Sequence, residues 1–151
     1  MKPIDLRSDT LTKPVAAMKQ AMFEADIGDD VYGEDPTVNM LEKKAAALLD
    51  KEDAIFCSSG TQSNLIALMA HCERGDEYIV GQDAHTYTYE PAGAAVLRSI
   101  QPQQLFFYAD GTLPVDPLRR FITSDDRHLL TTNFLFLQPT HGRYTPPLPT
   151  P

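Results

Sequence analysis

The sequence is poor in several residues and patterns, and each shortage argues against a class of protein. Its 151 residues include no tryptophan and two cysteines, Cys57 and Cys72, which lack a C-x-x-C spacing. Cys57 falls in an apolar run and Cys72 near the end of a helical pattern, so we expect reduced core thiols rather than a disulfide. We predict no metal site, because the acidic loop at residues 29–35 lacks the alternating ligands of a calcium loop.

Positive charge and long apolar runs are also scarce. Lysines and arginines number 13 against 21 aspartates and glutamates, which gives a net charge of -8. This balance argues against nucleic acid or an anionic membrane as the main partner. No apolar run approaches the length of a membrane span, and the first five residues lack the apolar region of a signal peptide. We therefore expect a cytoplasmic protein.

The patterns that are present are typical of a globular α/β protein, with 42% hydrophobic and 23% charged residues. Apolar residues at helical spacing alternate along the chain with short apolar runs typical of strands. Strands that alternate with helices indicate a mainly parallel sheet. The predicted helices begin at Pro14, Pro36 and Gly60 and cover 92–97 and 116–122, and the predicted strands cover 54–57, 77–80, 104–108 and 129–137.

The segment Ser58-Ser59-Gly60-Thr61-Gln62-Ser63-Asn64 is the strongest candidate site. It joins the predicted buried strand at 54–57 to an apolar helix, and free N–H groups and hydroxyls at a helix N-terminus suit a phosphate. On local sequence alone, an ordinary capped turn is an equally good interpretation. A polar loop with His85 follows the strand at 77–80, where ligand-binding residues of parallel sheets collect, although an exposed loop histidine is the commoner case.

Three further segments accompany this one in a recognisable order. They are Asp5-Leu6-Arg7-Ser8-Asp9-Thr10, Gly28-Asp29-Asp30-Val31-Tyr32-Gly33 and Ala84-His85. Together the four segments resemble the low-specificity L-threonine aldolase family, in register from about Ile4 to Leu137. The resemblance implies the aspartate-aminotransferase-like fold of pyridoxal-phosphate enzymes. Residues 1–138 would be the N-terminal portion of its major domain.

The same resemblance implies roles for residues around the cofactor. Gly60 and Thr61 match positions that hold the phosphate of pyridoxal 5'-phosphate. His85 matches a histidine that stacks on the cofactor and is proposed to help deprotonate the substrate hydroxyl. His128 matches a second active-site histidine, and which of the two acts as the base is left open. An imidazole suits this role because its reference pKa of about 6.5 lies near working pH.

Three more positions match substrate-binding residues of the family. Ser8 matches a serine near the substrate carboxylate, and Glu90 matches an acid of the active-site neighbourhood. Tyr32 matches a tyrosine that reaches into a neighbouring subunit's site, which implies a homo-oligomer, a tetramer in the family. The implied substrate is a β-hydroxy-α-amino acid, with L-threonine or L-allo-threonine cleaved to glycine and acetaldehyde.

The positions of lysine and proline point to an incomplete enzyme. All six lysines precede residue 52. The family holds its cofactor with a lysine in a part of the sequence that follows the 151 residues present here. Where the family typically has Glu-Asn-Thr-His-Asn, this chain has Gln138-Pro139-Thr140-His141-Gly142, and five prolines fall within 139–151. We therefore expect an extended or disordered tail at 139–151 and a truncated or frameshifted chain that is inactive alone. The alternatives are a non-catalytic fragment, another pyridoxal-phosphate lyase or aminotransferase, and a generic phosphate-binding module.

Overall fold

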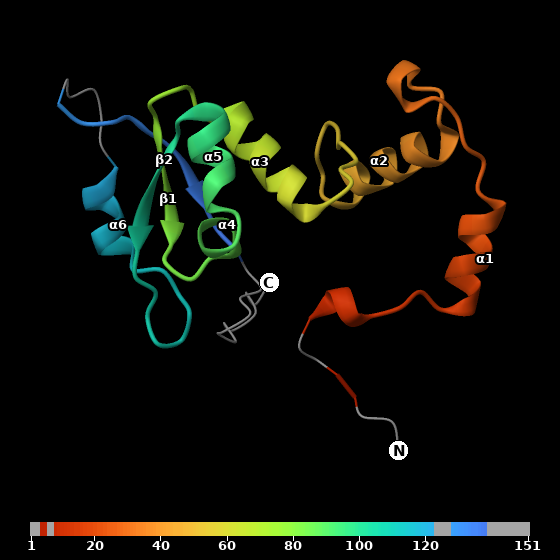
Figure 1. Ribbon diagram of the computed structural model, residues 1–151, viewed down its shortest axis with the longest axis horizontal. Helices are drawn as coiled ribbons and strands as arrows, with labels where there is room; N and C mark the ends of the chain where they lie inside the picture. Colours follow the sequence, from red (N-terminus) through yellow and green to blue (C-terminus); the bar gives the residue numbers. More distant parts are fainter. Residues whose placement is uncertain (1–3, 6–7, 123–127, 139–151) are drawn as a thin grey trace. The chain divides into compact units, whose positions relative to one another are not determined.

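A computed structural model of the chain describes residues 4–5, 8–122 and 128–138 (Figure 1). The chain divides into two compact units, an N-terminal unit, Met1–Cys57, and a C-terminal unit, Ser58–Pro151. The predicted tail at 139–151 lies outside the described residues.

The N-terminal unit is helical. It contains the 3-10 turns η1 (Asp9–Leu11) and η2 (Asp30–Tyr32) and the helices α1 (Ala16–Glu24) and α2 (Pro36–Leu48). The predicted start of α2 is confirmed, because the carboxylate of Asp35 accepts hydrogen bonds of 2.9 Å from the N–H groups of both Thr37 and Val38.

The apolar stripe predicted for α1 is present but uncovered. Val15, Met18 and Met22 are each more than half exposed. Among the described residues of this unit, Ala46 is the one buried apolar side chain. Amphipathic spacing identifies the face of a helix that is suited to packing, but the described residues of the N-terminal unit supply no second layer against α1.

The C-terminal unit is built on a parallel sheet with strand order β2-β1-β3. The strands are β1 (Glu77–Gly81), β2 (Gln101–Leu105) and β3 (Thr132–Phe136). This confirms the predicted α/β class with a parallel sheet. The helices are α3 (Gly60–His71), α4 (His85–Thr88), α5 (Pro91–Arg98) and α6 (Val115–Phe121).

The chain crosses the sheet in opposite directions after β1 and after β2. It passes through α4 and α5 to reach β2 on one side of β1, and then through α6 to reach β3 on the other side. Right-handed crossovers in opposite directions place α5 and α6 on opposite faces of the sheet, as Figure 1 shows. The helix α3 contacts α5 and β3, so it shares the face covered by α5.

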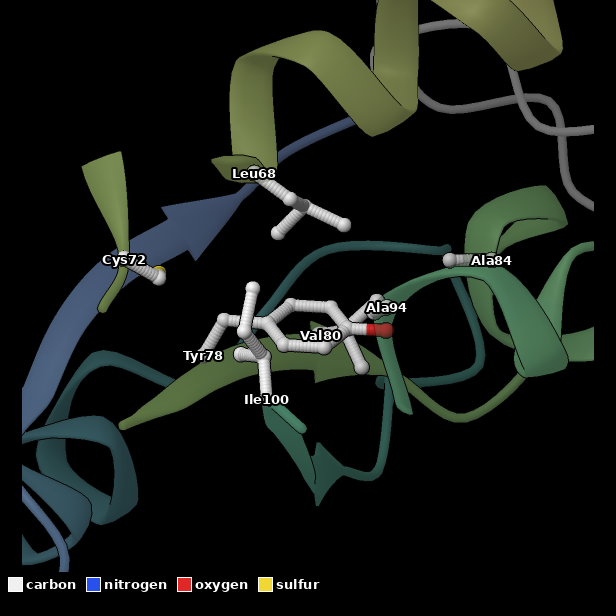
Figure 2. Packing of buried hydrophobic residues seen from close by; sticks show 7 residues of the cluster. All are labelled: Leu68, Cys72, Tyr78, Val80, Ala84, Ala94 and Ile100. Carbon is white, nitrogen blue, oxygen red and sulfur yellow. The ribbon is translucent and has the colours of Figure 1, made fainter. Parts of the chain in front are cut away.

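The core of this unit forms between β1 and the α3–α5 layer (Figure 2). Tyr78 and Val80 of β1 pack with Leu68 of α3 and Ala94 of α5, and Cys72, Ala84 and Ile100 complete the cluster. Ile79 is equally buried, and alternation along a strand directs it to the opposite face. Cys72 is a free buried thiol, as expected, and its pKa is raised by burial and then by the nearby charge of Asp76.

The predicted buried strand at 54–57 is wrong. These residues adopt no strand, and the side chains of Ile55 and Phe56 are 71% and 53% exposed. The N–H of Phe56 bonds the side chain of Glu42 at 2.7 Å instead of a neighbouring strand. An apolar run becomes a strand when another strand pairs with it, and none of the described strands does so.

The predicted strand at 104–108 is displaced. The observed strand β2 begins at Gln101 and ends at Leu105, which pairs with Gly81 at the end of β1. After Gly81 the chain turns toward α4, so Phe106 and the residues after it have no β1 backbone beside them. Pro102 is tolerated within β2 because β2 is an edge strand.

A methyl group at Gly81 would overlap the ring of Phe107 at the end of the central strand. We expect Gly81→Ala to lower the free energy of unfolding by about 1–3 kcal/mol, because an overpacked core must displace the ring. The urea midpoint measures this loss. The matched control is Gly60→Ala, since a Cβ at Gly60 meets no atom within 4 Å. Equal midpoints for Gly81→Ala and the unsubstituted chain would contradict the close packing.

Candidate functional site

The carboxyl ends of the three strands meet at one edge of the sheet, and hydrogen bonds join the segments that follow them. After β1, the side-chain oxygen of Gln82 accepts a 2.8 Å bond from the N–H of Phe107, which follows β2. The N–H of His85 donates a 2.9 Å bond to Oε1 of Gln138, which follows β3. Ligands of open parallel sheets bind at this edge, where the connections diverge.

His85 is the first residue of α4 rather than part of the predicted polar loop. Its ring nitrogen Nδ1 lies 2.7 Å from Oε1 of Glu90, and its ring centroid lies 5.0 Å from that of Tyr89. The His85 side chain is 52% exposed and that of Glu90 only 9%. The histidine therefore presents a free part of its ring to a ligand while the nearly buried carboxylate holds the other part.

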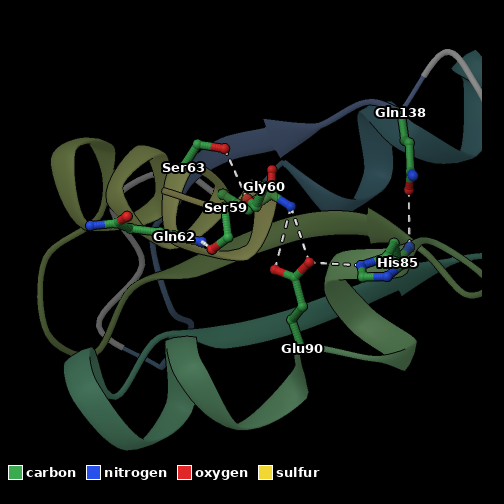
Figure 3. Close-up of polar contacts among 8 residues, drawn as sticks. Ser59, Gly60, Gln62, Ser63, His85, Glu90 and Gln138 are labelled. Carbon is green, nitrogen blue, oxygen red and sulfur yellow. Dashed lines mark hydrogen bonds and ion pairs between the residues drawn. The ribbon is translucent and has the colours of Figure 1, made fainter. Parts of the chain in front are cut away.

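Glu90 also bonds α3 (Figure 3). The side-chain nitrogen Nδ2 of Asn64 lies 3.2 Å from Oε1 and 3.3 Å from Oε2 of Glu90. A nearly buried carboxylate is stable only when donors replace its lost hydration. Asn64 and His85 supply those donors from two different helices, α3 and α4.

The predicted turn at residues 59–61 is the N-terminus of α3. Ser59 is the N-cap, and its hydroxyl oxygen accepts a 3.1 Å bond from the N–H of Gln62. The N–H groups of Gly60 and Thr61 belong to the first turn, where no carbonyl within the helix can accept them. Gly60 and Thr61 are both exposed, so these donors and the positive end of the helix dipole are accessible to an anion.

A pocket of about 170 Å³ connects this helix end to Glu90. Its lining includes the buried hydroxyl of Thr86, which has no hydrogen-bond partner among the described residues. The other lining residues are largely apolar and come from α3, α5 and the turn before α5. They are Thr61, Leu65, Leu68, Tyr89, Glu90, Gly93 and Ala94.

Tyr78 packs in the core with Leu68 and Ala94, which also line this pocket. Burial, and then the neighbouring Tyr87, Glu90 and Cys72, raise the pKa of Tyr78 to about 12. The phenol therefore keeps its proton at neutral pH, and it does not compete with His85 as a proton acceptor.

His128 lies at the other end of the sheet. Thr132 of β3 pairs with Glu77 at the amino end of β1, and His128 precedes Thr132 by four residues. His85 follows the carboxyl end of β1, and a strand of this length spans about 16 Å. The structure therefore does not bring His85 and His128 together within one chain.

Ser8 and Tyr32 belong to the N-terminal unit, whereas Gly60, Thr61, His85 and Glu90 belong to the C-terminal unit. The hydroxyl groups of Ser8 and Thr10 are 2.8 Å apart. Tyr32 is the last residue of η2 and is 79% exposed. The substrate-binding roles of Ser8 and Tyr32 therefore stay predictions.

The loop that carries Tyr32 has a fixed backbone. The N–H of Gly28 donates a 3.1 Å bond to Oδ2 of Asp35, and a Cβ at Gly28 would overlap the carbonyl oxygen of Glu34. The N–H groups of Val38, Gly28 and Thr37 lower the pKa of the Asp35 carboxyl from its ordinary value of 3.8, against a smaller effect of burial. The carboxylate that closes this loop is therefore ionised at neutral pH.

Two residues that contact the site, Asn64 and Gln138, were not predicted from the sequence to have a role there. Asn64 lies within the recognised segment 58–64, one helical turn after Gly60, and this spacing could have indicated a side chain on the same face. Gln138 was noted only as a departure from the family pattern. Its place directly after a predicted strand marks it as a candidate for the ligand-binding edge.

Comparison with known proteins identifies the class. The beta-eliminating lyase family matches residues 5–145, and the chain belongs to this family. It is 59% identical over 139 residues to the low specificity L-threonine aldolase of Escherichia coli (strain K12), over 92% of this chain and 42% of that protein. It is 41% identical over 145 residues to the probable low-specificity L-threonine aldolase 2 of Arabidopsis thaliana, over 94% of this chain and 41% of that protein. The family inferred from the four segments is therefore confirmed.

The chain spans less than half the length of these curated relatives. In the part of the chain that the structure describes, no helix combines the length and apolar character needed to cross a bilayer. Within the same residues, no three His, Cys, Asp or Glu side chains are grouped to hold a metal ion.

Proposed function

We propose that this chain supplies the phosphate-binding and proton-transfer parts of a pyridoxal-phosphate-dependent aldolase site, which cleaves L-threonine and L-allo-threonine to glycine and acetaldehyde. One observation carries the proposal: Thr61, in the accessible first turn of α3, and Glu90, whose carboxylate contacts the ring of His85, line the same pocket. The names of the relatives support the choice of substrate.

The residues present fit the phosphate end of pyridoxal phosphate. The N–H groups of Gly60 and Thr61 and the Thr61 hydroxyl would hold the phosphate at the positive end of α3. A Cβ at Gly60 would meet no atom, so there is open space at this turn. The half-exposed ring of His85 would stack on the pyridine ring. When bound, the cofactor supplies an electron sink for breaking the Cα–Cβ bond.

The hydrogen bonds of His85 suit it to act as a base. If Nδ1 carries its proton toward Glu90, the other nitrogen, Nε2, keeps a lone pair that can accept the proton of the substrate β-hydroxyl. The bond from the His85 N–H to Gln138 fixes the backbone from which the ring projects. We assign the base to His85 rather than to His128, because His128 lies at the opposite end of the sheet.

Ser8, Tyr32 and Glu90 are proposed to contact or enclose the substrate. The structure gives Glu90 a definite contact with His85, which supports a place beside the reacting hydroxyl. The exposure of Tyr32 is compatible with a contact to a second subunit, and we propose a homo-oligomer, a tetramer, located in the cytoplasm.

The lysine count favours a second possibility for the 151 residues taken alone. The C-terminal unit contains no lysine, so it offers no side-chain amine to hold the cofactor aldehyde beside His85. The isolated chain would then bind the cofactor through its phosphate without catalysing the cleavage.

Replacing Thr61 tests the phosphate site. We expect Thr61→Val to weaken binding of pyridoxine 5'-phosphate about tenfold or more, because a hydrogen bond to a charged group contributes about 1.5–3 kcal/mol. This probe lacks the aldehyde, so it cannot form adducts with the lysines at positions 2–51. Calorimetry measures the affinity. The matched control is Thr131→Val, an exposed threonine before β3. If both substitutions weaken the binding of pyridoxine 5'-phosphate equally, or if neither weakens it, the assignment is contradicted.

The cleavage itself is tested in a protein that includes the part of the relatives that this chain does not match. Residues 1–138 joined to the remaining part of the E. coli relative should release acetaldehyde from L-threonine with pyridoxal phosphate, whereas the 151-residue chain should not. In the joined protein, His85→Asn should lower kcat by about 10²–10⁴-fold, as expected for loss of a general base. An unchanged kcat in His85→Asn, or turnover by the 151-residue chain, would contradict the proposal.

A further inference from the structure

We propose that Asn64 is a positioning residue that holds the Glu90 carboxylate against His85. Neither the family resemblance nor the names of the relatives gives Asn64 a role. The catalytic consequence rests on the function proposed above, but the hydrogen-bond arrangement does not. The position of Asn64 makes α3 responsible for both the phosphate site at its first turn and the orientation of the base.

The contacts of Glu90 single out Asn64. Nδ2 of Asn64 lies 3.2 and 3.3 Å from the two carboxylate oxygens, so one amide group spans both. Glu90 occupies the N-cap position of α5, yet its side chain makes no capping bond to that helix. Its carboxylate points instead toward α3 and α4 (Figure 3). Besides His85, the described residues show no side-chain donor to Glu90 other than Asn64.

An asparagine suits this role for a chemical reason. Its amide donates two hydrogens and carries no charge, so it can fix a carboxylate without neutralising it. A lysine or arginine at this place would compete with the imidazole for the carboxylate. The carboxylate therefore keeps its full capacity to accept a proton-bearing nitrogen from His85.

The tautomer of His85 follows from this arrangement. A carboxylate accepts, so Nδ1 of the neutral ring must carry the hydrogen, and Nε2 is left with a lone pair. When Asn64 does not hold Glu90, the long glutamate side chain is free to leave the ring. Removing a residue that orients a functional side chain commonly lowers activity by about 10–100-fold.

The experiment reads the tautomer directly by nitrogen-15 NMR of histidine-labelled chain at about pH 8.5, above the ordinary imidazole pKa. We expect the unsubstituted chain to show the Nδ1–H form of His85. Asn64→Leu should shift the signal toward the Nε2–H form. Glu90→Gln should retain much of the Nδ1–H form because its amide oxygen still accepts, whereas Glu90→Leu should lose it.

The chain provides a matched control. Nδ2 of Asn133 donates a 2.6 Å bond to a carboxylate oxygen of Asp76 at the amino end of the sheet. Asn133→Leu removes the same kind of bond at a distance from His85, and it should leave the tautomer unchanged. In the joined protein, Asn64→Leu should lower kcat about 10–100-fold with KM nearly unchanged, whereas Asn133→Leu should alter neither.

The outcomes separate this inference from the proposed function. An Nε2–H form in the unsubstituted chain, or an unchanged tautomer in Asn64→Leu, would overturn the role of Asn64. A tautomer that shifts in Asn64→Leu but not in Asn133→Leu supports the role. If the tautomer shifts as expected but the joined protein releases no acetaldehyde, the aldolase function fails and the hydrogen-bond role stands. Should Asn64→Leu fail to fold, Asn64→Asp, which keeps the shape but loses the donor, gives the same reading.

Discussion

The pairing of β1 with a parallel neighbour on each side is the constraint on which the rest of the C-terminal unit depends. All five residues of β1 are buried, and their registers with β2 and β3 bring the three carboxyl ends to one edge. Because the chain leaves β1 and β2 in opposite directions, the backbone after Gly81 has room to form α4. His85 is thus placed by the sheet, and its backbone bond to Gln138 confirms how closely the segments after β1 and β3 approach.

The second constraint is electrostatic. Glu90 is a carboxylate that is 9% exposed, and such a group requires donors in place of water. Its donors come from Asn64 on α3 and His85 on α4. The hydrogen bonds of one nearly buried carboxylate therefore fix how these two helices pack. The same connection keeps Thr61, in the first turn of α3, at the pocket that Glu90 also lines. The anion site and the proton-transfer site that we propose are therefore parts of one arrangement.

Local signals predicted part of this structure, and long-range pairing decided the rest. Asp35-Pro36 begins a helix because a carboxylate and a proline suit a first turn in any context. The apolar residues 54–57 looked equally decisive, yet none of the described strands pairs with them. β2 ends at Leu105 because its partner β1 ends at Gly81. The sequence of residues 104–108 does not contain this information. At the site, Gly60, Thr61, His85 and Glu90 were predicted from a family resemblance and lie in one unit. Asn64 was missed because its importance comes from a contact with a residue 26 positions later.

The central claim is that the first turn of α3 and the ring of His85 belong to one phosphate-ligand site. The most direct test is an NMR titration of the nitrogen-15-labelled chain with pyridoxine 5'-phosphate. We expect the amide signals of Gly60 and Thr61 and the ring signals of His85 to shift together, with a common saturation point. Shifts confined to the amino end of the sheet, around Asn133 and His128, or shifts of Gly60 and Thr61 without His85, would contradict it.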